Sequence, residues 1–435
     1  MLTYHLKTAL TSLRRNPVLT ALLIGGIALG ICVSTAFVTL RHFYTQAPLP
    51  TKSDQVHYVR LDSWGDHPYR DQEGAIPDQI TYRDAQALMR SPIPKRATAS
   101  YVTAMFVYPD AKVARPYQPN IRMAMADFFD IFEMPFTYGG PWTKAADAKP
   151  EYVTVIDHAT NAKLFGGANS VGKTIRMGEH NYRITGVLAP YRPAMRWFEM
   201  NRDAFGPPEP IYIPFNLTPT LQIYSMGNNS GWDGKPINSF EEWLQSERAW
   251  VQFWVELPDA KTKAAYSDWL RSYITDQKKI GRFRRPIRYE LTTIQGLINE
   301  WSLMPSGVKA MSVVSLLFLV VCSLNLVGIL LGKFLARIPE VSVRRALGAS
   351  RAQIFWQHVI ECELIGAIGG IVGIALSAAI LNILARFMQN GEALHLDSEM
   401  LMLATILSLV AGLVAGIYPA WRVCTVAPAM QLKVQ

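Results

Sequence analysis

The chain has 435 residues, enough for two or three domains, and half of its residues are apolar. Its formal net charge is +9. The Lys and Arg residues form no basic run interleaved with aromatic residues, so this charge does not indicate a nucleic-acid-binding protein.

The first residues have the spacing of an amphipathic helix. One face of this helix would carry apolar residues: Leu2, Leu6, Ala9, Leu10 and Leu13. Asn16-Pro17 then interrupts the pattern, so we expect a short helix over 1–17 that lies along the membrane interface.

Four long windows carry no charged residue, and each is long enough for a helix of about 20 residues that crosses a membrane. The windows are Val18–Leu40, Ala310–Gly332, Leu364–Ala385 and Met400–Trp421. We therefore predict four transmembrane helices that contain them, over 18–40, 309–333, 361–387 and 400–421. No clear small-x-small cleavage site ends the first window, so we expect a retained helix rather than a cleaved signal peptide.

The distribution of Lys and Arg predicts the orientation of these helices. The cations gather in 1–17, around 334–360 and in the tail 422–435, whereas the loop 388–399 has none. We therefore expect a multi-pass membrane protein with both termini and 334–360 in the cytoplasm. Residues 41–308 would form a large external domain, and 388–399 a short external loop. The basic charge then reflects topology and contact with membrane lipid.

The strand and helix patterns of 41–308 predict a large α+β domain. All four cysteines lie outside it, so its core rather than disulfides must stabilise it. Similar patterns at its two ends suggest two subdomains, one built from 50–125 and 246–300 and the other from the inserted 126–245. The polar stretch 224–246 reads as an irregular, exposed loop that could contact a substrate or partner.

Residues 167–174 match the phosphate-binding pattern GxxxxGK[ST]. A working phosphate-binding loop follows a strand and opens a helix. Here a predicted helix precedes the segment and a strand follows it. We therefore interpret the segment as a Gly-rich turn and not as an ATP site.

The sequence offers no catalytic set and no metal site. His358 and Glu361 lie three residues apart on one predicted helix, but no second His or Cys completes a ligand set. The predicted spans carry few polar residues, notably Asn325 and Asn382, and no buried acidic residue is expected in them. This argues against a proton-coupled pump. We expect no catalytic residue, bound cofactor or metal ion in this chain.

Small residues recur at helical spacing in the last two predicted spans. Glycines at such spacing let helix backbones approach closely, within one subunit or across a dimer. The candidate packing residues are Gly366, Gly369, Gly370, Gly373, Gly412 and Gly416.

The segment 334–360 predicts a short capped helix that ends at a glycine and is followed by a second helix from Ser350. Such a helix could contact a motor protein, or it could bind anionic lipid through Arg344 and Arg345. The residue types alone leave both interpretations open.

Motifs in the right order resemble a known family. Glu340–Ser350 with the paired glycines that follow, Gly416–Ala420, and Ser12–Pro17 resemble the FtsX-type permease domain. In between, Asp127–Phe129, Lys163–Gly166, Val171–Ile175, Ile184–Val187 and Ile211–Pro214 resemble the MacB-type periplasmic domain. Ser342 stands where the family usually has Gly, and Trp421 and Cys424 replace an Arg/Ala-rich run.

This resemblance implies the permease subunit of a MacB-type ABC transporter in the bacterial inner (cytoplasmic) membrane. Residues 41–308 would then be a large periplasmic domain, and 388–399 a short periplasmic loop. ATP hydrolysis by a separate ATPase subunit, which would hold ATP and Mg, would drive periplasmic conformational change and export or efflux (mechanotransmission). The residues expected to couple to the ATPase are Glu340, Val341, Val343, Arg344, Arg345, Ala346, Leu347, Gly348 and Ala349.

The resemblance also implies partners and two alternative functions. The partners would be the ABC ATPase, a second permease copy or paralogue in a dimer, and possible further partners, namely a periplasmic adaptor and an outer-membrane channel. The alternatives are an FtsX-like regulatory subunit that controls a periplasmic hydrolase and a Lol-like lipoprotein-releasing permease.

Overall fold

The computed structural model describes residues 9, 11–45, 49, 51–67, 69–71, 74–110, 115–191, 193, 195–199, 204–302, 304–388 and 394–425. These residues divide into two compact units. The helical unit comprises the described residues up to 45 and from 304 onward, and the α/β unit comprises those from 49 to 302.

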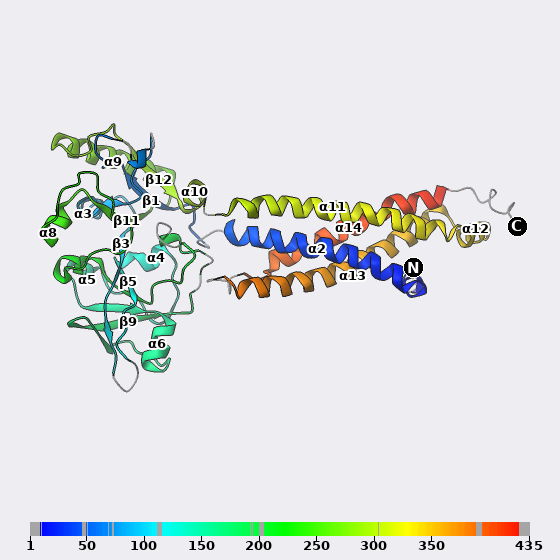
Figure 1. Ribbon diagram of the computed structural model, residues 1–435, viewed down its shortest axis with the longest axis horizontal. Helices are drawn as coiled ribbons and strands as arrows, with labels where there is room; N and C mark the ends of the chain where they lie inside the picture. Colours follow the sequence, from blue (N-terminus) through cyan, green and yellow to red (C-terminus); the bar gives the residue numbers. More distant parts are fainter. Residues whose placement is uncertain are drawn as a thin grey trace. The chain divides into compact units, whose positions relative to one another are not determined.

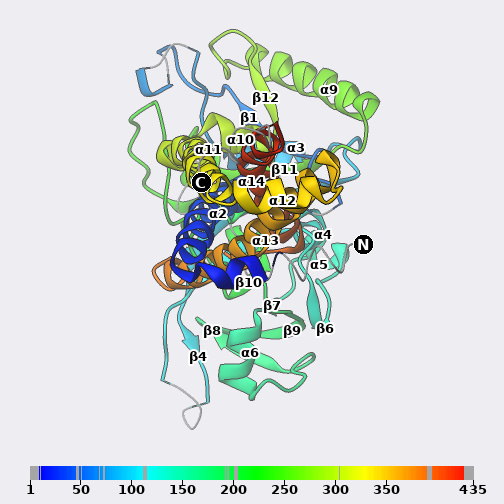
Figure 2. The same ribbon diagram turned by 90° about the vertical axis from the view of Figure 1, so that its right-hand side faces the viewer.

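Four long helices form most of the helical unit: α2 (Pro17–Thr45), α11 (Ser306–Leu335), α13 (Arg351–Ala385) and α14 (Ser398–Thr425). Each is long and apolar enough to cross a membrane. They lie side by side (Figures 1 and 2), with α13 packed on α14 and α2, and α11 packed on α2 and α14. The chain therefore has the four transmembrane helices that its charge-free windows predict.

The helices extend beyond most of the predicted spans. The largest extension is in α13, which starts at Arg351, ten residues before the predicted span 361–387. Ser350 and Gln353 form a capping box there, which stabilises the start of a helix in the segment expected to precede the membrane. Residues 1–8 and 10 of the predicted interfacial helix and 426–435 of the predicted tail lie outside the described residues, whereas Ala9 and 11–15 are helical.

In the described residues of the α/β unit, twelve strands join in one mixed sheet. The main order is β12-β1-β11-β3-β5-β10-β7-β9-β8-β4, while β2 pairs with β11 and β6 with β9. The strands are β1 (Val56–Leu61), β2 (Ile80–Thr81), β3 (Arg96–Ala104), β4 (Val107–Tyr108), β5 (Asn120–Ala124), β6 (Phe136–Gly139), β7 (Val153–Ile156), β8 (Thr174–Met177), β9 (His180–Leu188), β10 (Ile211–Pro214), β11 (Ala249–Glu256) and β12 (Tyr289–Thr293).

Short helices connect the strands, and only α9 is long among those described. They are η1 (Tyr69–Asp71), α3 (Tyr82–Leu88), α4 (Asp127–Ile131), α5 (Lys144–Ala148), α6 (His158–Phe165), η2 (Trp197–Glu199), η3 (Phe215–Leu217), α7 (Thr218–Leu221), α8 (Phe240–Gln245), α9 (Ala260–Lys279) and α10 (Ile294–Glu300). The fold is thus the mixed helix-and-strand class that the sequence predicts.

The order of the strands in the sheet largely follows the predicted division of the domain into two parts. Strands from 50–125 and 246–300 fill the half from β12 to β5, and strands from 126–245 fill the half that begins at β10. Parallel pairing of β5 with β10 joins the halves. The exception is β4, which comes from the first segment and pairs with β8. The boundary between two subdomains stays a prediction.

Both faces of the sheet are buried. Along β11, Phe253 and Val255 belong to one apolar cluster, whereas Trp254 between them belongs to a second. Successive side chains of a strand point to opposite faces, so the two clusters lie on the two sides of the sheet. This explains why β11 is buried along its whole length.

The expectation of an exposed, irregular loop over 224–246 is wrong at its C-terminal end. Residues 240–245 form α8, which Ser239 caps by accepting a hydrogen bond from the Glu242 N–H. Trp243 is buried and stacks on Trp250 with ring centroids 4.0 Å apart. The polar composition of the stretch concealed this aromatic anchor.

A buried charge network occupies the middle of the sheet. The Arg122 guanidinium on β5 is fully buried and donates to both Glu209 oxygens, at 3.0 and 3.1 Å, and to Gln252 Oε1 at 3.0 Å. It also pairs with Glu199. Burial raises the pKa of Glu199. Burial opposes ionisation of Glu209 too, but the charge of Arg122 holds the pKa of that carboxyl below its ordinary value.

Removing this guanidinium should destabilise the fold strongly. Arg122→Leu leaves two carboxylates buried without their main partner, which costs about 3–5 kcal/mol. We expect a clear fall in the thermal midpoint of the purified full chain. Arg183→Gln is the matched control, because its ion pair with Glu151 is about half exposed. Equal midpoints for the two variants would contradict this account.

Candidate functional site

A short helix connects the ends of α11 and α13. After α11 ends at Leu335, α12 spans Ile338–Ala346, with Pro339 in its first turn, where the missing N–H costs nothing. Gly348 follows with φ +101°, a left-handed conformation that favours glycine. The Ser350 capping box then starts α13. The chain thus forms the capped helix and glycine stop that the sequence predicts.

The two faces of α12 differ. Ile338 and Val341 are buried, and Val341 belongs to the apolar core of the helical unit. Val343 and Leu347 lie four residues apart on the other side and are 58% and 84% exposed. The helix is thus anchored by one face and presents an exposed apolar pair on the other.

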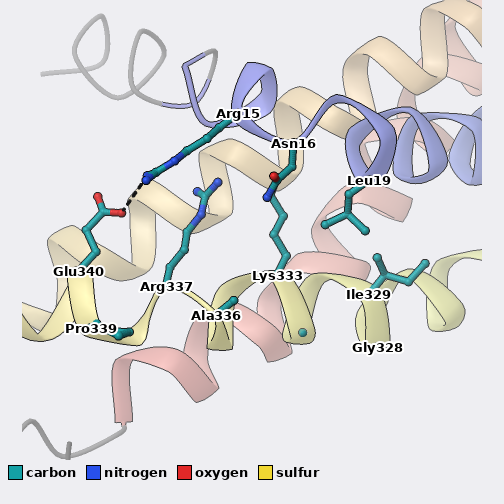
Figure 3. A pocket seen from close by; sticks show the side chains of 11 residues that line it. Arg15, Asn16, Leu19, Gly328, Ile329, Lys333, Ala336, Arg337, Pro339 and Glu340 are labelled. Atoms are coloured by element: carbon teal, nitrogen blue, oxygen red, sulfur yellow. Dashed lines mark ion pairs between the residues drawn. The ribbon is translucent and has the colours of Figure 1, made fainter. Parts of the chain in front are cut away.

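Polar side chains hold α12 in place beside this surface. Arg344 donates to Glu340 one turn away, at 2.6 Å, and to Gln357 on α13 at 3.2 Å. Arg15 lies 3.7 Å from the other Glu340 oxygen (Figure 3). These contacts connect α12 to the N-terminal segment and to α13.

The predicted coupling residues therefore differ in burial and fall into three groups. Val341 faces the core, and Ala349 packs partly against it. Arg344 and Arg345 are half-buried. The exposed group is Glu340, Val343, Ala346, Leu347 and Gly348.

Beneath α12 lies a buried ion pair. Lys333 near the end of α11 and Glu361 in α13 are 2.7 Å apart, and both side chains are almost completely buried. Arg337 approaches the second Glu361 oxygen at 3.5 Å and donates to the Ser12 hydroxyl at 2.5 Å. Ser12 in turn donates to Glu361. Three helical segments therefore meet at one carboxylate.

This pair corrects a prediction. The expectation that the spans contain no buried acidic residue is wrong, since Glu361 is the first residue of the predicted span 361–387 and is buried. Its neighbour His358 does not turn towards a metal site. The His358 ring packs on Phe334, with centroids 4.4 Å apart, and its Nδ1 lies 2.8 Å from the Ile354 carbonyl oxygen. Lys333 and Glu361 are 28 residues apart in the sequence, with no spacing signal that would pair them.

Asn325 and Asn382, the two polar residues singled out within the predicted spans, are exposed on the surface of the helical unit. Neither belongs to the buried cluster at Glu361. These two asparagines thus lie on the surface of the unit, whereas the buried charged cluster is formed near the end of α11 and around Glu361 in α13.

The predicted packing glycines do bring helices together within this chain. At Gly366, an added Cβ would lie 3.1 Å from the Gly412 Cα. At Gly416 it would lie 2.5 Å from the Cys362 Cβ, and at Gly370 it would lie 2.4 Å from the Ser408 Oγ. These three contacts fasten α13 to α14.

The other two candidates fasten α13 to α2. An added Cβ at Gly369 would lie 2.9 Å from the Ile27 Cβ, and one at Gly373 would lie 2.7 Å from the Ala28 carbonyl oxygen. Glycine therefore permits helix approach distances that no other residue allows here.

The segment that matches a phosphate-binding pattern forms a turn. It follows α6, whose end is at Gly166 with φ +66°, and it leads into β8. Ser170 and Ala168 both contact the Asn161 side chain, which holds the turn on α6. The interpretation as a helix-to-strand turn is confirmed, and the strand-to-helix geometry of a phosphate-binding loop is not formed at this position.

Two family models match the chain. Residues 20–273 match the MacB-like periplasmic core domain, and residues 312–428 match the FtsX-like permease C-terminal domain. Together they cover most of the α/β unit, up to residue 273, and most of the helical unit.

Curated relatives are similar over much of the chain. The macrolide export ATP-binding/permease protein MacB of Syntrophobacter fumaroxidans is 23% identical over 468 residues, covering 98% of this chain and 63% of that protein. The pyoverdine export ATP-binding/permease protein PvdT of Pseudomonas aeruginosa is 25% identical over 321 residues, covering 71% and 41%. The chain thus spans less than two thirds of the length of these relatives.

Among solved structures, the periplasmic region of MacB from Actinobacillus actinomycetemcomitans aligns with 59% of this chain and 96% of its own length. That alignment has a TM-score of 0.37 and 12% sequence identity.

Close packing at the glycines predicts a clear stability effect. Gly366→Leu would force a side chain into the backbone of α14, and such overpacking costs about 1–3 kcal/mol. We expect a lower thermal midpoint for the detergent-solubilised chain. Size-exclusion chromatography of samples heated to increasing temperatures measures this midpoint. Gly25→Leu is the control, because an added Cβ at Gly25 meets nothing within 4 Å. An unchanged midpoint for Gly366→Leu would show that α13 and α14 are not in backbone contact at Gly366 and Gly412.

The buried ion pair predicts a compensating double variant. Glu361→Gln leaves two cations without their carboxylate and should destabilise the chain by about 3–5 kcal/mol. Adding Lys333→Met should restore part of the loss, since it removes one stranded charge. Thermal unfolding in detergent measures both effects. Glu399→Gln, which changes an exposed carboxylate in the first turn of α14, is the control and should change the midpoint little.

Proposed function

The chain belongs to the family with a MacB-like periplasmic core domain, here joined to an FtsX-like permease domain, and on that premise we propose that it is the permease subunit of an ABC transporter. In this proposal, ATP hydrolysis on an ABC ATPase changes the conformation of the α/β unit and thereby drives export or efflux. The ATP and Mg belong to the ATPase, which is a separate subunit, and this chain supplies no catalytic residue.

The proposed orientation places α12 and both termini in the cytoplasm and the α/β unit in the periplasm of a bacterium, with the spans in the inner membrane. The Lys and Arg distribution supports it. Arg337, Arg344 and Arg345 lie at the α12 end, while the described side chain of Asp397 lies at the opposite ends of α13 and α14.

The exposed side of α12 is the observation that carries this proposal. Val343 and Leu347 offer an apolar contact, and Arg344 with Glu340 offers charged groups at its edge. A soluble ATPase could bury this pair without moving Val341 from the core. The helix would then act as the coupling helix between the ATPase and the spans.

A displacement of α12 would be transmitted to α11 and α13 at the same time. α12 follows α11 directly and precedes α13, and the Lys333–Glu361 pair joins those two helices. The glycine contacts tie α13 to α2 and α14. Such close packing favours movement of the helices as rigid bodies rather than local deformation.

Motion would pass into the α/β unit through two covalent connections. The chain runs from α2 into β1 and from β12 through α10 into α11. β1 and β12 pair with each other over five residue pairs, from His57 with Thr293 to Leu61 with Tyr289. Arg60 on β1 pairs with Glu290 and also with Glu300 at the end of α10, at 2.6 Å. A change in the separation of α2 and α11 would therefore strain one edge of the sheet.

A dimer with a second permease copy or a paralogue would suit α11. Only 28% of its apolar window is buried, against 39–44% for the other three spans. Leu317, Val321 and Leu324 are exposed along one side of it, close to Asn325. A partner helix would shield that amide from lipid. A periplasmic adaptor and an outer-membrane channel complete the proposed assembly, and the MacB-like match favours export over regulation of a hydrolase.

Disrupting the α12 surface should release the ATPase. We expect the wild-type chain to co-purify stoichiometrically in detergent with the ABC ATPase encoded beside it. Val343→Asp with Leu347→Asp should lower recovery at least about tenfold, because two apolar contacts of about 1 kcal/mol or more are lost.

Phe387→Asp is the matched control, since Phe387 is 83% exposed just beyond the opposite end of α13. Size-exclusion chromatography checks that each variant remains folded. Undiminished ATPase recovery by the double variant would remove α12 as the docking surface. Failure of the folded wild-type chain to bind any ABC ATPase would overturn the transporter proposal itself.

A further inference from the structure

An open pocket lies beside the buried ion pair in the helical unit. Its volume is about 610 Å³, and the end of α11, the start of α12 and the residues at the start of α2 form its walls (Figure 3). The pocket is separate from the exposed Val343 and Leu347 pair, which does not contribute to its lining.

The pocket is basic. Arg15, Lys333 and Arg337 contribute to its lining, and Glu340 is its acidic residue. With Arg344, which pairs with Glu340, four cations share two carboxylates, the second being Glu361. Two positive charges are therefore in excess in this cluster, which suits an anionic ligand.

One of these cations has unused hydrogen-bonding capacity. The side chain of Lys333 is 1% exposed, and its ammonium can donate three hydrogen bonds. Nζ lies 2.7 Å from Glu361 Oε1, but it forms no hydrogen bond of acceptable geometry with any described residue. A buried ammonium is costly unless acceptor oxygens complete its surroundings. Because Nζ is enclosed, its charge adds positive potential to the pocket wall, while Arg15 and Arg337 are the more exposed donors that a phosphate can reach.

The opposite part of the pocket is apolar. Leu19 on α2 and Ile329 on α11 line it, together with Gly328 and Gly332. An added Cβ at either glycine would meet nothing within 4 Å, so both leave open space along α11. The pocket thus combines a basic end with an apolar groove on two spans, as a phospholipid with a charged headgroup and acyl chains requires.

We propose that this pocket binds an anionic phospholipid of the membrane leaflet at the α12 end. The phosphate lies between Arg15 and Arg337, beside the buried charge of Lys333, and an acyl chain follows Leu19 and Ile329. Arg15 and Arg337 come from segments on either side of the pocket, so one phosphate can contact both. The lipid then stabilises the arrangement of α2, α11 and the start of α12.

Lipid retention by the purified full chain tests this proposal. The chain is reconstituted in nanodiscs with equal amounts of phosphatidylglycerol and phosphatidylcholine, and native mass spectrometry measures the lipids that remain bound after release. Wild type should retain phosphatidylglycerol preferentially. Arg15→Gln should lower that retention about fivefold, because one Arg near the surface contributes about that much to anionic lipid binding. Gly332→Leu should lower it as well by filling the groove.

Two matched controls separate the pocket from general effects. Arg14→Gln removes an exposed neighbouring charge that does not line the pocket, and Gly25→Leu enlarges an exposed α2 glycine that also does not line it. Both should retain phosphatidylglycerol as wild type does. Lys333 and Arg337 are left unchanged because they stabilise the buried ion pair.

Equal retention of the two lipids by wild type would overturn the proposal, as would retention that Arg15→Gln and Gly332→Leu leave unchanged. Displacement of phosphatidylglycerol by millimolar inorganic phosphate would show a site for free phosphate instead and would overturn the lipid assignment. None of these readouts depends on an ATPase, so this proposal and the transporter proposal can fail separately.

Discussion

The ion pair between Lys333 and Glu361 is the interaction on which the helical unit depends most. Two charges without water are costly apart and favourable only together, so the end of α11 must remain in contact with α13 around Glu361. Arg337 and Ser12 join the same carboxylate and bring the N-terminal segment to it. The cluster thus lies at the N-terminal end of the nine-residue helix α12, directly after Arg337.

Close packing extends this constraint along the spans. The glycines of α13 allow backbone contact with α14 on one side and with α2 on the other, in a setting where lipid offers no hydrophobic driving force between helices. α11 has no equivalent glycine contacts in its outer part and leaves much of its surface exposed. The unit therefore has a tightly packed group of helices and one helix whose outer side suits another subunit.

The α/β unit has a comparable internal anchor. Arg122 joins β5 to the segment around Glu199 and Glu209, and the aromatic clusters cover both faces of the sheet. Pairing of β1 with β12 brings together the two chain segments that continue into α2 and α11. The fold thus places the two covalent links to the membrane at neighbouring strands, although they are more than 200 residues apart in the sequence.

By itself, the sequence determined the properties that depend on local composition and spacing. Charge-free length defines a membrane-crossing helix, so the four windows predicted α2, α11, α13 and α14. A proline, a glycine and a serine cap likewise predicted α12 and its end, and glycine spacing identified Gly366 and Gly412 as packing residues. The order of elements around 167–174, with a helix before the turn and a strand after it, was also predicted from the sequence.

Only the tertiary structure decided which distant groups meet. Nothing in the spacing of Lys333 and Glu361 indicates an ion pair, because they lie on different helices whose relative rotation depends on packing. The same packing turned Val341 inward and Leu347 outward on α12, and it buried Trp243 within a stretch whose polar composition predicts a loop. Burial and partner choice are properties of the assembled fold, since they depend on side chains brought together from segments far apart in the chain.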